Sequence, residues 1–295
     1  MVKNPNIPGW AKFGEMLPRH LSSDVSLDKW QVPLIVPKGV CLMLSEPGCG
    51  KTWITTAIGL AVSDAVHLGG VVPAVCPGII DPEFYGIDPQ FVVGHYSRED
   101  DPADLKERNE ILAKGKEIQN YYVATNCHDL KLTPGVERVK LEVTVKKFRP
   151  ALLVFDTARR FIEGDENDSE VVSSMMEFLH KLYAKYGTSS LLNHHLRKGS
   201  DSPRGSGDFS GAAHYVGVMR KTELTGCSVA AEIETVKTKA VLAPPTWAFG
   251  ITDAVPREML ITWWSDDIAR VNGLRRQMGE RPIHVTSREQ LGGRR

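Results

Sequence analysis

Residues 41–54 read CLMLSEPGCGKTWI, an apolar run that breaks into serine, proline and glycine and then resumes as a helical pattern. Its centre, SEPGCGKT at 45–52, differs from the phosphate-binding signature GxxxxGK[ST] at one place, because Ser45 stands where the first glycine is expected. The run 40–44 has the character of a buried strand, and 51–66 repeats apolar residues at helical spacing. The stretch therefore predicts a strand, a loop and a helix, which is the context that a phosphate loop requires.

In such a loop the glycines let backbone N–H groups surround a phosphate, and the N-terminus of the helix adds partial positive charge. Lys51 is expected to reach the β- and γ-phosphates of a nucleotide, and Thr52 to ligate Mg²⁺. A small residue at position 45 is tolerated if its φ is negative. The alternative interpretation is a plain turn between strand and helix. The predicted nucleotide-binding residues are Ser45, Glu46, Pro47, Gly48, Cys49, Gly50, Lys51 and Thr52.

The composition is that of an ordinary globular protein. The 295 residues include 36 Lys and Arg against 36 Asp and Glu, so attraction to nucleic acid must come from a local patch. The five cysteines show no CxxC spacing, which argues against a zinc ribbon or a disulfide framework. The N-terminus has no apolar leader, and no window is long and apolar enough to span a bilayer. We expect a cytoplasmic protein with no membrane segment.

The rest of the chain alternates strand and helix patterns, which predicts a doubly wound, mostly parallel α/β sheet with helices on both faces. Further strands are expected at 91–97, 120–125, 151–156 and 188–195. One helix should include Asp104 as its cap and run to about Lys116, and another should be capped by Ser169. Periodicity leaves 134–148 undecided between helix and strand, and we choose a helix because parallel strands need a crossover there.

The last third of the chain departs from this alternation. Residues 199–211 are so rich in glycine and serine that they predict a mobile loop. Four segments of period two follow and predict antiparallel strands that extend one edge of the sheet; they are 213–223, 228–240, 246–252 and 258–264. We therefore divide the chain into an N-terminal arm at 1–28, an α/β domain at 29–266 and a polar, basic tail at 267–295.

Polar residues at the ends of the predicted central strands are candidates for chemistry. Asp156 closes an apolar strand and is placed to hold Mg²⁺, although strand-end aspartates also serve as helix caps. Glu99 follows another strand and is the candidate to polarise an attacking water, the alternative being a surface acid. His194 and His195 end a third strand, where one of them could sense a γ-phosphate. Adjacent strand residues face opposite ways, so only one histidine can point at the nucleotide.

Several basic residues lie in the later segments. Arg197, Lys198 and Arg204 lie in or beside the glycine- and serine-rich loop and could bind a phosphate backbone, or Arg204 could act on the nucleotide of a neighbouring subunit. Lys237 and Lys239 share one face of a late strand and could reach a γ-phosphate across a subunit boundary, although a solvated strand face is the simpler reading.

Taken together, these segments resemble the RecA-type ATPases, and most closely the RepA-like group that includes hexameric plasmid replicative helicases. The resemblance covers about residues 30 to 240. It rests on segments that occur in the order of the family, namely SEPGCGKT, SRED, VFDTARRF followed by GDEN, LLNHHLRKGS, RGSGDFSGAA and the late KTK.

The resemblance implies a RecA-like fold that binds ATP and Mg²⁺, with single-stranded DNA and further copies of the chain in a hexameric ring as partners. It implies nucleotide contacts at 45–52, a catalytic Glu99, a Mg²⁺-associated Asp156 and a switch histidine at His195. Arg204 would lie near the DNA channel or a subunit interface. Lys237 and Lys239 resemble the element by which related rings reach the γ-phosphate of the adjacent subunit, where the family has an arginine in place of one lysine.

Three functions are compatible with these patterns. The first is a Mg²⁺-dependent ATP hydrolase that acts as a DNA motor, a hexameric RepA-like replicative helicase. The second is a DNA-binding ATPase of the same fold that regulates or loads without unwinding. The third is a small-molecule kinase, which would have no use for Glu99 together with a late KTK segment.

Overall fold

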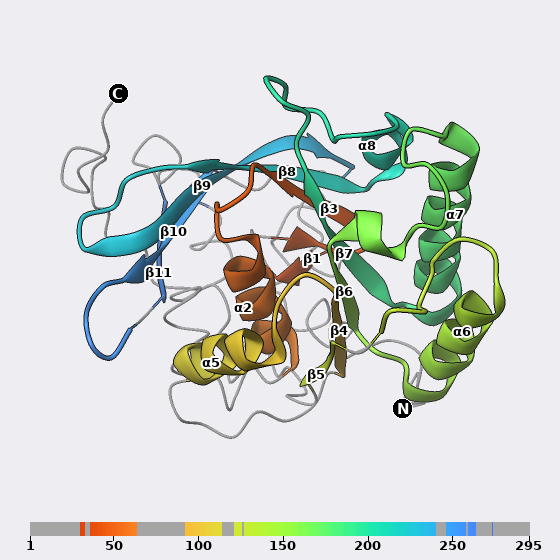
Figure 1. The fold of residues 1–295 in the computed structure, drawn as a ribbon, viewed down its shortest axis with the longest axis horizontal. Helices are drawn as coiled ribbons and strands as arrows, with labels where there is room; N and C mark the ends of the chain where they lie inside the picture. The colour runs from red at the N-terminus through yellow and green to blue at the C-terminus, as the bar shows by residue number, and fades with distance from the viewer. Residues whose placement is uncertain are drawn as a thin grey trace.

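The computed structural model of the chain describes residues 30–32, 36–63, 92–113, 121–125, 127–239, 246–257, 259–263 and 273. Figure 1 shows the elements in chain order. They are β1 (Trp30–Val32), β2 (Val36–Pro37), β3 (Val40–Ser45), α2 (Lys51–Ser63), β4 (Val93–Ser97), α5 (Pro102–Ala113), β5 (Tyr121–Ala124), α6 (Val136–Phe148), β6 (Leu152–Asp156), the 3₁₀ turn η2 (Ala158–Phe161), α7 (Ser169–Tyr186), β7 (Ser189–His195), α8 (Asp208–Ala212), β8 (Tyr215–Lys221), β9 (Cys227–Thr238), β10 (Trp247–Thr252) and β11 (Met259–Trp263).

The main sheet has nine strands in the order β11-β10-β9-β8-β3-β7-β6-β4-β5. The six strands from β8 to β5 pair in parallel, and β9, β10 and β11 continue the sheet in antiparallel pairing. The mostly parallel α/β fold is therefore confirmed. Because β3, β7, β6 and β4 run in one direction, the loops after their carboxyl ends meet at one edge of the sheet, where ligands bind in open α/β folds.

The antiparallel extension begins one strand later than the sequence predicted. We expected the segment 213–223 to be antiparallel, but β8 pairs in parallel with β3, and the reversal of direction comes at β9. An alternating pattern is the same for both directions of pairing, so periodicity alone could not distinguish them. As a consequence β3, which leads into the phosphate loop, has a parallel neighbour on each side.

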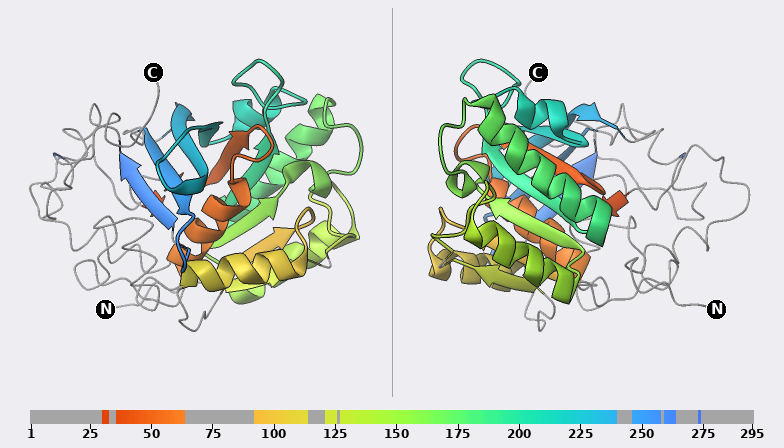
Figure 2. Two further views of the ribbon diagram at one scale, coloured as in Figure 1. Left: turned by 60° about the vertical axis from the view of Figure 1, so that its left-hand side comes forward. Right: turned by 90° about the vertical axis from the view of Figure 1, so that its right-hand side faces the viewer.

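Helices cover both faces of the sheet. Figure 2 shows α2 and α5 in front of the sheet in one view and α6 and α7 in front of it in the other. Apolar side chains of α2, including Ile54 and Ile58, are buried against the first face. The second face holds a large cluster of buried apolar residues, to which β3 contributes Leu42, β6 contributes Phe155 and α7 contributes Met175. The strand ends that carry the candidate residues are thus fixed by packing on both sides.

Helix α7 shows how local sequence sets these elements. Its apolar residues recur every three or four positions, and those on the buried stripe are Val172, Met175, Met176, Phe178, Leu179, Leu182 and Tyr186. The N-cap is Asp168, whose carboxylate accepts hydrogen bonds from two backbone N–H groups of the first turn. Our assignment of the cap to Ser169 was wrong by one residue. Gly187 ends the helix with a left-handed φ of 73°.

The two other helix predictions had different outcomes. The segment 134–148 does form a helix, α6, as the need for a crossover indicated. Helix α5 begins at Pro102, so Asp104 lies inside its first turn and is not the cap. Asp101 takes that place, because its Oδ1 accepts a hydrogen bond from the backbone N–H of Ala103 at 2.8 Å.

The glycine- and serine-rich segment 199–211 is more ordered than we predicted. It contains the start of α8, and backbone hydrogen bonds join Arg204 N–H to the His195 carbonyl at 2.9 Å and Ser206 N–H to the Glu166 carbonyl at 2.8 Å. These bonds connect the segment to β7 and to the loop before α7. Local composition suggested mobility, but contacts that are distant in sequence give the segment a defined path.

Two of the predicted divisions fall largely outside the described residues. The arm at 1–28 lies outside them, and so does the tail at 267–295 apart from Gly273. The predicted end of α2 at 64–66 and of α5 at 114–116 also lie outside them. Within the described part of the chain, no helix has both the length and the apolar character that crossing a bilayer demands.

Candidate active site

The phosphate loop connects β3 to α2 at the edge where the parallel strands end. Gly48 and Gly50 have φ values of 76° and 80°, in the left-handed region that favours glycine. A Cβ atom on Gly50 would also stand 2.8 Å from Cγ1 of Val229 on β9, so this position has no room for a side chain. Among the described non-glycine residues only Arg149 has a positive φ, so Ser45 needs no glycine-like backbone. The substitution in the signature therefore leaves the shape of the loop intact.

Ser45 contacts the lysine of the loop directly. The Lys51 ammonium donates a hydrogen bond to Ser45 Oγ at 2.8 Å, and that hydroxyl donates to the carbonyl of Glu46 at 2.6 Å. Both Ser45 and Lys51 are buried. Burial lowers the pKa of Lys51 below its ordinary value, while the negative charge of Asp156 opposes that shift. The residue that departs from the signature is therefore a hydrogen-bond partner of the loop's cation.

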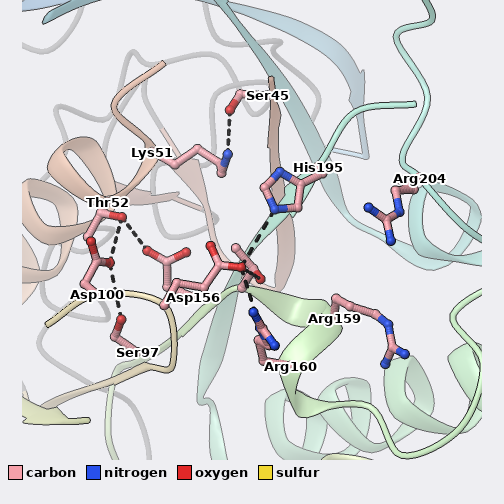
Figure 3. Close-up of polar contacts among 12 residues, drawn as sticks. Ser45, Lys51, Thr52, Ser97, Asp100, Asp156, Arg159, Arg160, His195 and Arg204 are labelled. Carbon is pink, nitrogen blue, oxygen red and sulfur yellow. Dashed lines mark hydrogen bonds and ion pairs between the residues drawn. The ribbon is translucent and has the colours of Figure 1, made fainter. Parts of the chain in front are cut away.

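Thr52 connects the helix to two carboxylates. Its Oγ1 lies 2.8 Å from Oδ2 of Asp156 and 3.1 Å from Oδ2 of Asp100 (Figure 3). Burial raises the pKa of Asp156 to about 6; the Thr52 hydroxyl opposes this shift, and the negative charges of Asp100 and Glu99 add to it. Asp100 was not among our candidates. The acid-rich SREDD segment was its only sequence signal, and that segment could equally have been a surface turn.

These oxygens fit Mg²⁺ as ligands. A hydroxyl and two carboxylates offer the hard oxygen donors that Mg²⁺ prefers. Burial, with smaller contributions from the charges of Asp100 and Glu99, disfavours the ionised Asp156 when no cation is present. In the described chain no group of three or more His, Cys, Asp or Glu side chains is arranged to hold a metal ion by itself. A Mg²⁺ ion here would need further oxygens, such as those of nucleotide phosphates, which is its usual mode of binding.

Glu99 follows β4 and turns toward the ends of β6 and β7. Its Oε1 accepts a hydrogen bond from Thr157 Oγ1 at 2.9 Å and lies 3.8 Å from both His195 Nε2 and Arg160 Nε. The His195 ring and the Thr157 hydroxyl hold the pKa of Glu99 below its ordinary value, against the effect of partial burial. The carboxylate is therefore ionised at neutral pH and available to accept a proton.

The two adjacent histidines face opposite ways, as their position on a strand requires. His194 is fully buried against Phe209, and its Nε2–H donates to the backbone carbonyl of Arg204 at 2.8 Å. Burial lowers the pKa of His194 to about 4, so this ring is neutral. His195 is partly exposed on the side of Glu99. The histidine that faces the candidate site is His195.

Two cavities meet at this edge of the sheet. The first, which we call the phosphate-loop cavity, has a volume of about 310 Å³. Its lining consists of Pro47, Gly48, Gly50, Lys51, Thr52, Trp53, Glu99, Arg108, Asp156, His195 and Val229. The second, which we call the basic cavity, has a volume of about 430 Å³. Its lining consists of Arg98, Glu99, Lys131, Thr157, Arg159, Arg160, Ile162, Glu166, His195 and Arg204. Glu99 and His195 line both cavities.

Three further predicted residues lie outside the phosphate-loop cavity. Arg204 lines the basic cavity, where its Nε donates to Oε1 of Glu166 at 2.7 Å. Lys237 donates to the carbonyls of Ser210 and Gly211, at 2.6 Å each. Lys239 donates to the carbonyl of Ala212 at 3.4 Å. Both lysines thus contact the end of α8 within their own chain, and neither lines the cavity beside the phosphate loop.

Comparison with known proteins assigns the chain to a family. A family profile described as an AAA domain matches residues 17–201, more than half of the chain. No curated protein matches the chain significantly. The matched range includes the phosphate loop, Glu99, Asp156 and His195, and it ends before Arg204 and the late lysines. The chain therefore belongs to the AAA domain family of P-loop ATPases, whose members bind and hydrolyse nucleotides.

Proposed function

We propose that this ATPase is a Mg²⁺-dependent DNA motor, a hexameric replicative helicase of the RepA-like group. One observation carries the proposal. Lys51 and Thr52 of the phosphate loop line one cavity together with Asp156 and Glu99, and Glu99 and His195 also line the second, basic cavity. A polyanion bound in the basic cavity would lie beside the proposed base of the hydrolytic site, so that DNA binding and ATP hydrolysis could influence each other.

The residues of the phosphate-loop cavity have complementary roles in hydrolysis. The loop amides and Lys51 would hold the β- and γ-phosphates of ATP, and Thr52 and Asp156 would hold Mg²⁺, which supplies charge neutralisation at those phosphates. Glu99 would orient a water molecule and accept its proton. The bond between the water oxygen and the γ-phosphorus forms as the bond from that phosphorus to the ADP oxygen breaks, which gives ADP and phosphate.

His195 and the loop beyond it would connect hydrolysis to movement. The ring lies between the two cavities, and the next residues lead to Arg204 in the basic cavity. A change at the γ-phosphate could therefore move the segment that contacts DNA. Single-stranded DNA would pass along the loops after Asp156 and His195, where Arg197 and Arg204 lie.

Subunit boundaries would complete the sites. Lys237 lies near the end of β9 and Lys239 directly after it. Neither lines the cavity beside the phosphate loop of its own chain, so they would act on a nucleotide in a neighbouring subunit. Their contacts with the carboxyl end of α8 would then connect the neighbour's nucleotide to the loop that follows His195.

The proposal is tested by ATP turnover of the full chain with and without single-stranded DNA, followed by strand displacement. Lys51→Ala should abolish hydrolysis, because it removes the cation at the phosphates. Lys140→Ala, an exposed change on α6, is the matched control. Turnover that DNA does not stimulate would count against a motor. DNA-stimulated turnover without strand displacement would instead identify a regulator or loader, and phosphate transfer to a small molecule would identify a kinase.

Shared sites have a test of their own. Lys51→Ala and Lys239→Ala chains should each be inactive alone, and a mixture should recover part of the activity, because some boundaries then combine an intact Lys51 with an intact Lys239. A mixture as inactive as its components would remove the support for sites completed by a neighbour.

A further inference from the structure

The basic cavity gathers more positive charge than its own carboxylates can neutralise. Five cationic side chains line it, from Arg98, Lys131, Arg159, Arg160 and Arg204, against two carboxylates, from Glu99 and Glu166. The pKa of Lys131 lies below its ordinary value because burial and the positive charge of Arg98, with smaller contributions from Arg159 and Arg160, disfavour the ammonium ion. Cations crowded in this way favour an anionic ligand.

Part of the cavity is a fixed frame. The side chain of Glu166 is only 6% exposed, and it pairs with Arg204 at 2.7 Å and with Arg159 at 3.5 Å. The backbone around Glu166 is fixed as well, because its carbonyl accepts from Ser206 N–H, and a Cβ on Gly205 would stand 2.5 Å from the same oxygen. Glu166 therefore neutralises and positions two of the arginines and keeps them at the cavity wall.

Arg160 has a different environment from its neighbour Arg159. Figure 3 shows the two side chains diverging from η2, Arg160 toward the centre of the site and Arg159 away from it. The Arg160 backbone is held, because its carbonyl accepts hydrogen bonds from Lys131 and Arg98. Its guanidinium side chain is 59% exposed and lies 3.8 Å from Oε1 of Glu99, which is beyond hydrogen-bond length. Such a pair is weak and readily exchanged for a better partner.

We infer that the basic cavity is a regulatory site, in which a phosphodiester of the DNA backbone competes with Glu99 for Arg160. This inference rests on the proposed function and deepens it. Without the phosphate, Arg160 pairs with the carboxylate and holds it toward the basic cavity. A phosphodiester offers Arg160 two oxygens in the geometry that a guanidinium prefers, which Glu99 at 3.8 Å does not. Glu99 then keeps its hydrogen bond from Thr157 and is free to act on water in the phosphate-loop cavity.

The inference predicts that one substitution, Arg160→Ala, raises the basal rate of ATP hydrolysis. Arg160→Ala should raise ATP turnover measured without DNA by roughly 2- to 5-fold, the range that an exposed ion pair can supply. The same variant should lose most of the further stimulation by DNA. Arg160→Lys keeps the charge but not the bidentate geometry, so it should retain low basal turnover and respond more weakly to DNA. A residue that only stabilises the fold would lower turnover in both conditions.

The experiment measures ATP turnover of the full chain with oligothymidylate and with the same oligomer carrying an uncharged methylphosphonate backbone. Wild-type turnover should respond to the charged oligomer only. Lys140→Ala on α6 is the control for the loss of one exposed cation, and thermal unfolding checks that each variant is folded. Lower basal turnover in Arg160→Ala, undiminished stimulation of that variant, or equal stimulation by the uncharged oligomer would each overturn the inference.

Binding measured without turnover separates this inference from the proposed function. Fluorescence anisotropy of labelled oligothymidylate should show weaker binding by Arg160→Ala. The slope of log affinity against log salt concentration should also fall by about one for this variant. If hydrolysis depended on Lys51 but not on Arg160, this inference would be wrong and the proposed function would be unaffected. If the wild-type chain hydrolysed no ATP, the proposed function would fail, and weaker binding by Arg160→Ala would still support an anion site at the basic cavity.

Discussion

The phosphate-loop cavity and the basic cavity share Glu99 and His195 but differ in the balance of their charges. The first sets Lys51 and Arg108 against Glu99 and Asp156, whereas the second has five cationic side chains against two carboxylates. Beside the phosphate loop, burial and the neighbouring charges of Asp100 and Glu99 raise the pKa of Asp156 to about 6. In the basic cavity, burial and neighbouring arginines lower the pKa of Lys131. In each cavity the crowded groups are more stable when a ligand of the opposite sign is present. One edge of the sheet therefore places buried acids and a cluster of cations next to each other, with Glu99 and His195 lining both cavities.

Asp156→Asn should have the largest effect among the changes that test this comparison. The amide keeps the shape of the side chain and removes the charge that would hold Mg²⁺, so ATP turnover should fall by about 10²–10³-fold. The measurement is turnover as a function of Mg²⁺ concentration, since part of the loss should recover at high Mg²⁺. Asp104→Asn, an exposed aspartate in the first turn of α5, is the matched control and should leave turnover unchanged.

The same substitution should stabilise the fold when Mg²⁺ and nucleotide are absent. The pKa of Asp156 is raised from 3.8 to about 6, so the folded chain binds more protons than the unfolded chain between these values. Stability should therefore fall as the pH rises from about 4 to 6 and stay lower above it. This penalty, roughly 3 kcal/mol, is absent in Asp156→Asn. Urea denaturation in a chelator at pH 8 measures the difference, and equal stability of the two proteins would contradict the raised pKa of Asp156.

Removal of one acid from the basic cavity should destabilise the fold, whereas removal of Asp156 should stabilise it. Glu166→Gln takes the carboxylate away from Arg159 and Arg204, so the free energy of unfolding should fall. We expect a loss of roughly 1–2 kcal/mol, less than for a fully buried ion pair because both arginines are partly exposed. Urea denaturation at pH 8 again provides the measurement. A more stable Glu166→Gln protein would show that the cations of the basic cavity do not need this carboxylate, which would contradict the difference between the two cavities.

The sequence predicted the parts of the site that depend on chain direction alone. Once 40–44 and 151–156 are recognised as parallel strands, the residues at their carboxyl ends must meet at one edge, and Lys51 and Asp156 do. The predictions that failed concern contacts between segments. The path of 199–211 depends on bonds to His195 and Glu166, and the parallel pairing of β8 depends on its neighbour β3.

Side-chain direction was equally hard to predict. Alternation along a strand shows that His194 and His195 differ, but the position of Phe209 and the Arg204 carbonyl decides which one is buried. The roles of Asp100 and Glu166 also depend on distant partners, Thr52 and Arg204 respectively. These contacts join residues that are from 10 to 48 positions apart in sequence, and no helical or strand period specifies them.

The smallest expected effect concerns Ser45, the residue that departs from the phosphate-loop signature. Its hydroxyl accepts a hydrogen bond from Lys51 at 2.8 Å, and a phosphate oxygen would have to replace that bond when the lysine reaches a nucleotide. Ser45→Ala removes the competing acceptor, so ATP should bind about 2- to 10-fold more tightly, the equivalent of one ordinary hydrogen bond. The measurement is titration with a fluorescent ATP analogue. Ser63→Ala, which removes another buried hydroxyl from the end of α2, is the control. If Ser45→Ala bound ATP more weakly and Ser63→Ala did not, the hydrogen bond from Lys51 to Ser45 would persist when ATP is bound. Ser45 would then help to position Lys51 at the phosphates and would not compete with them.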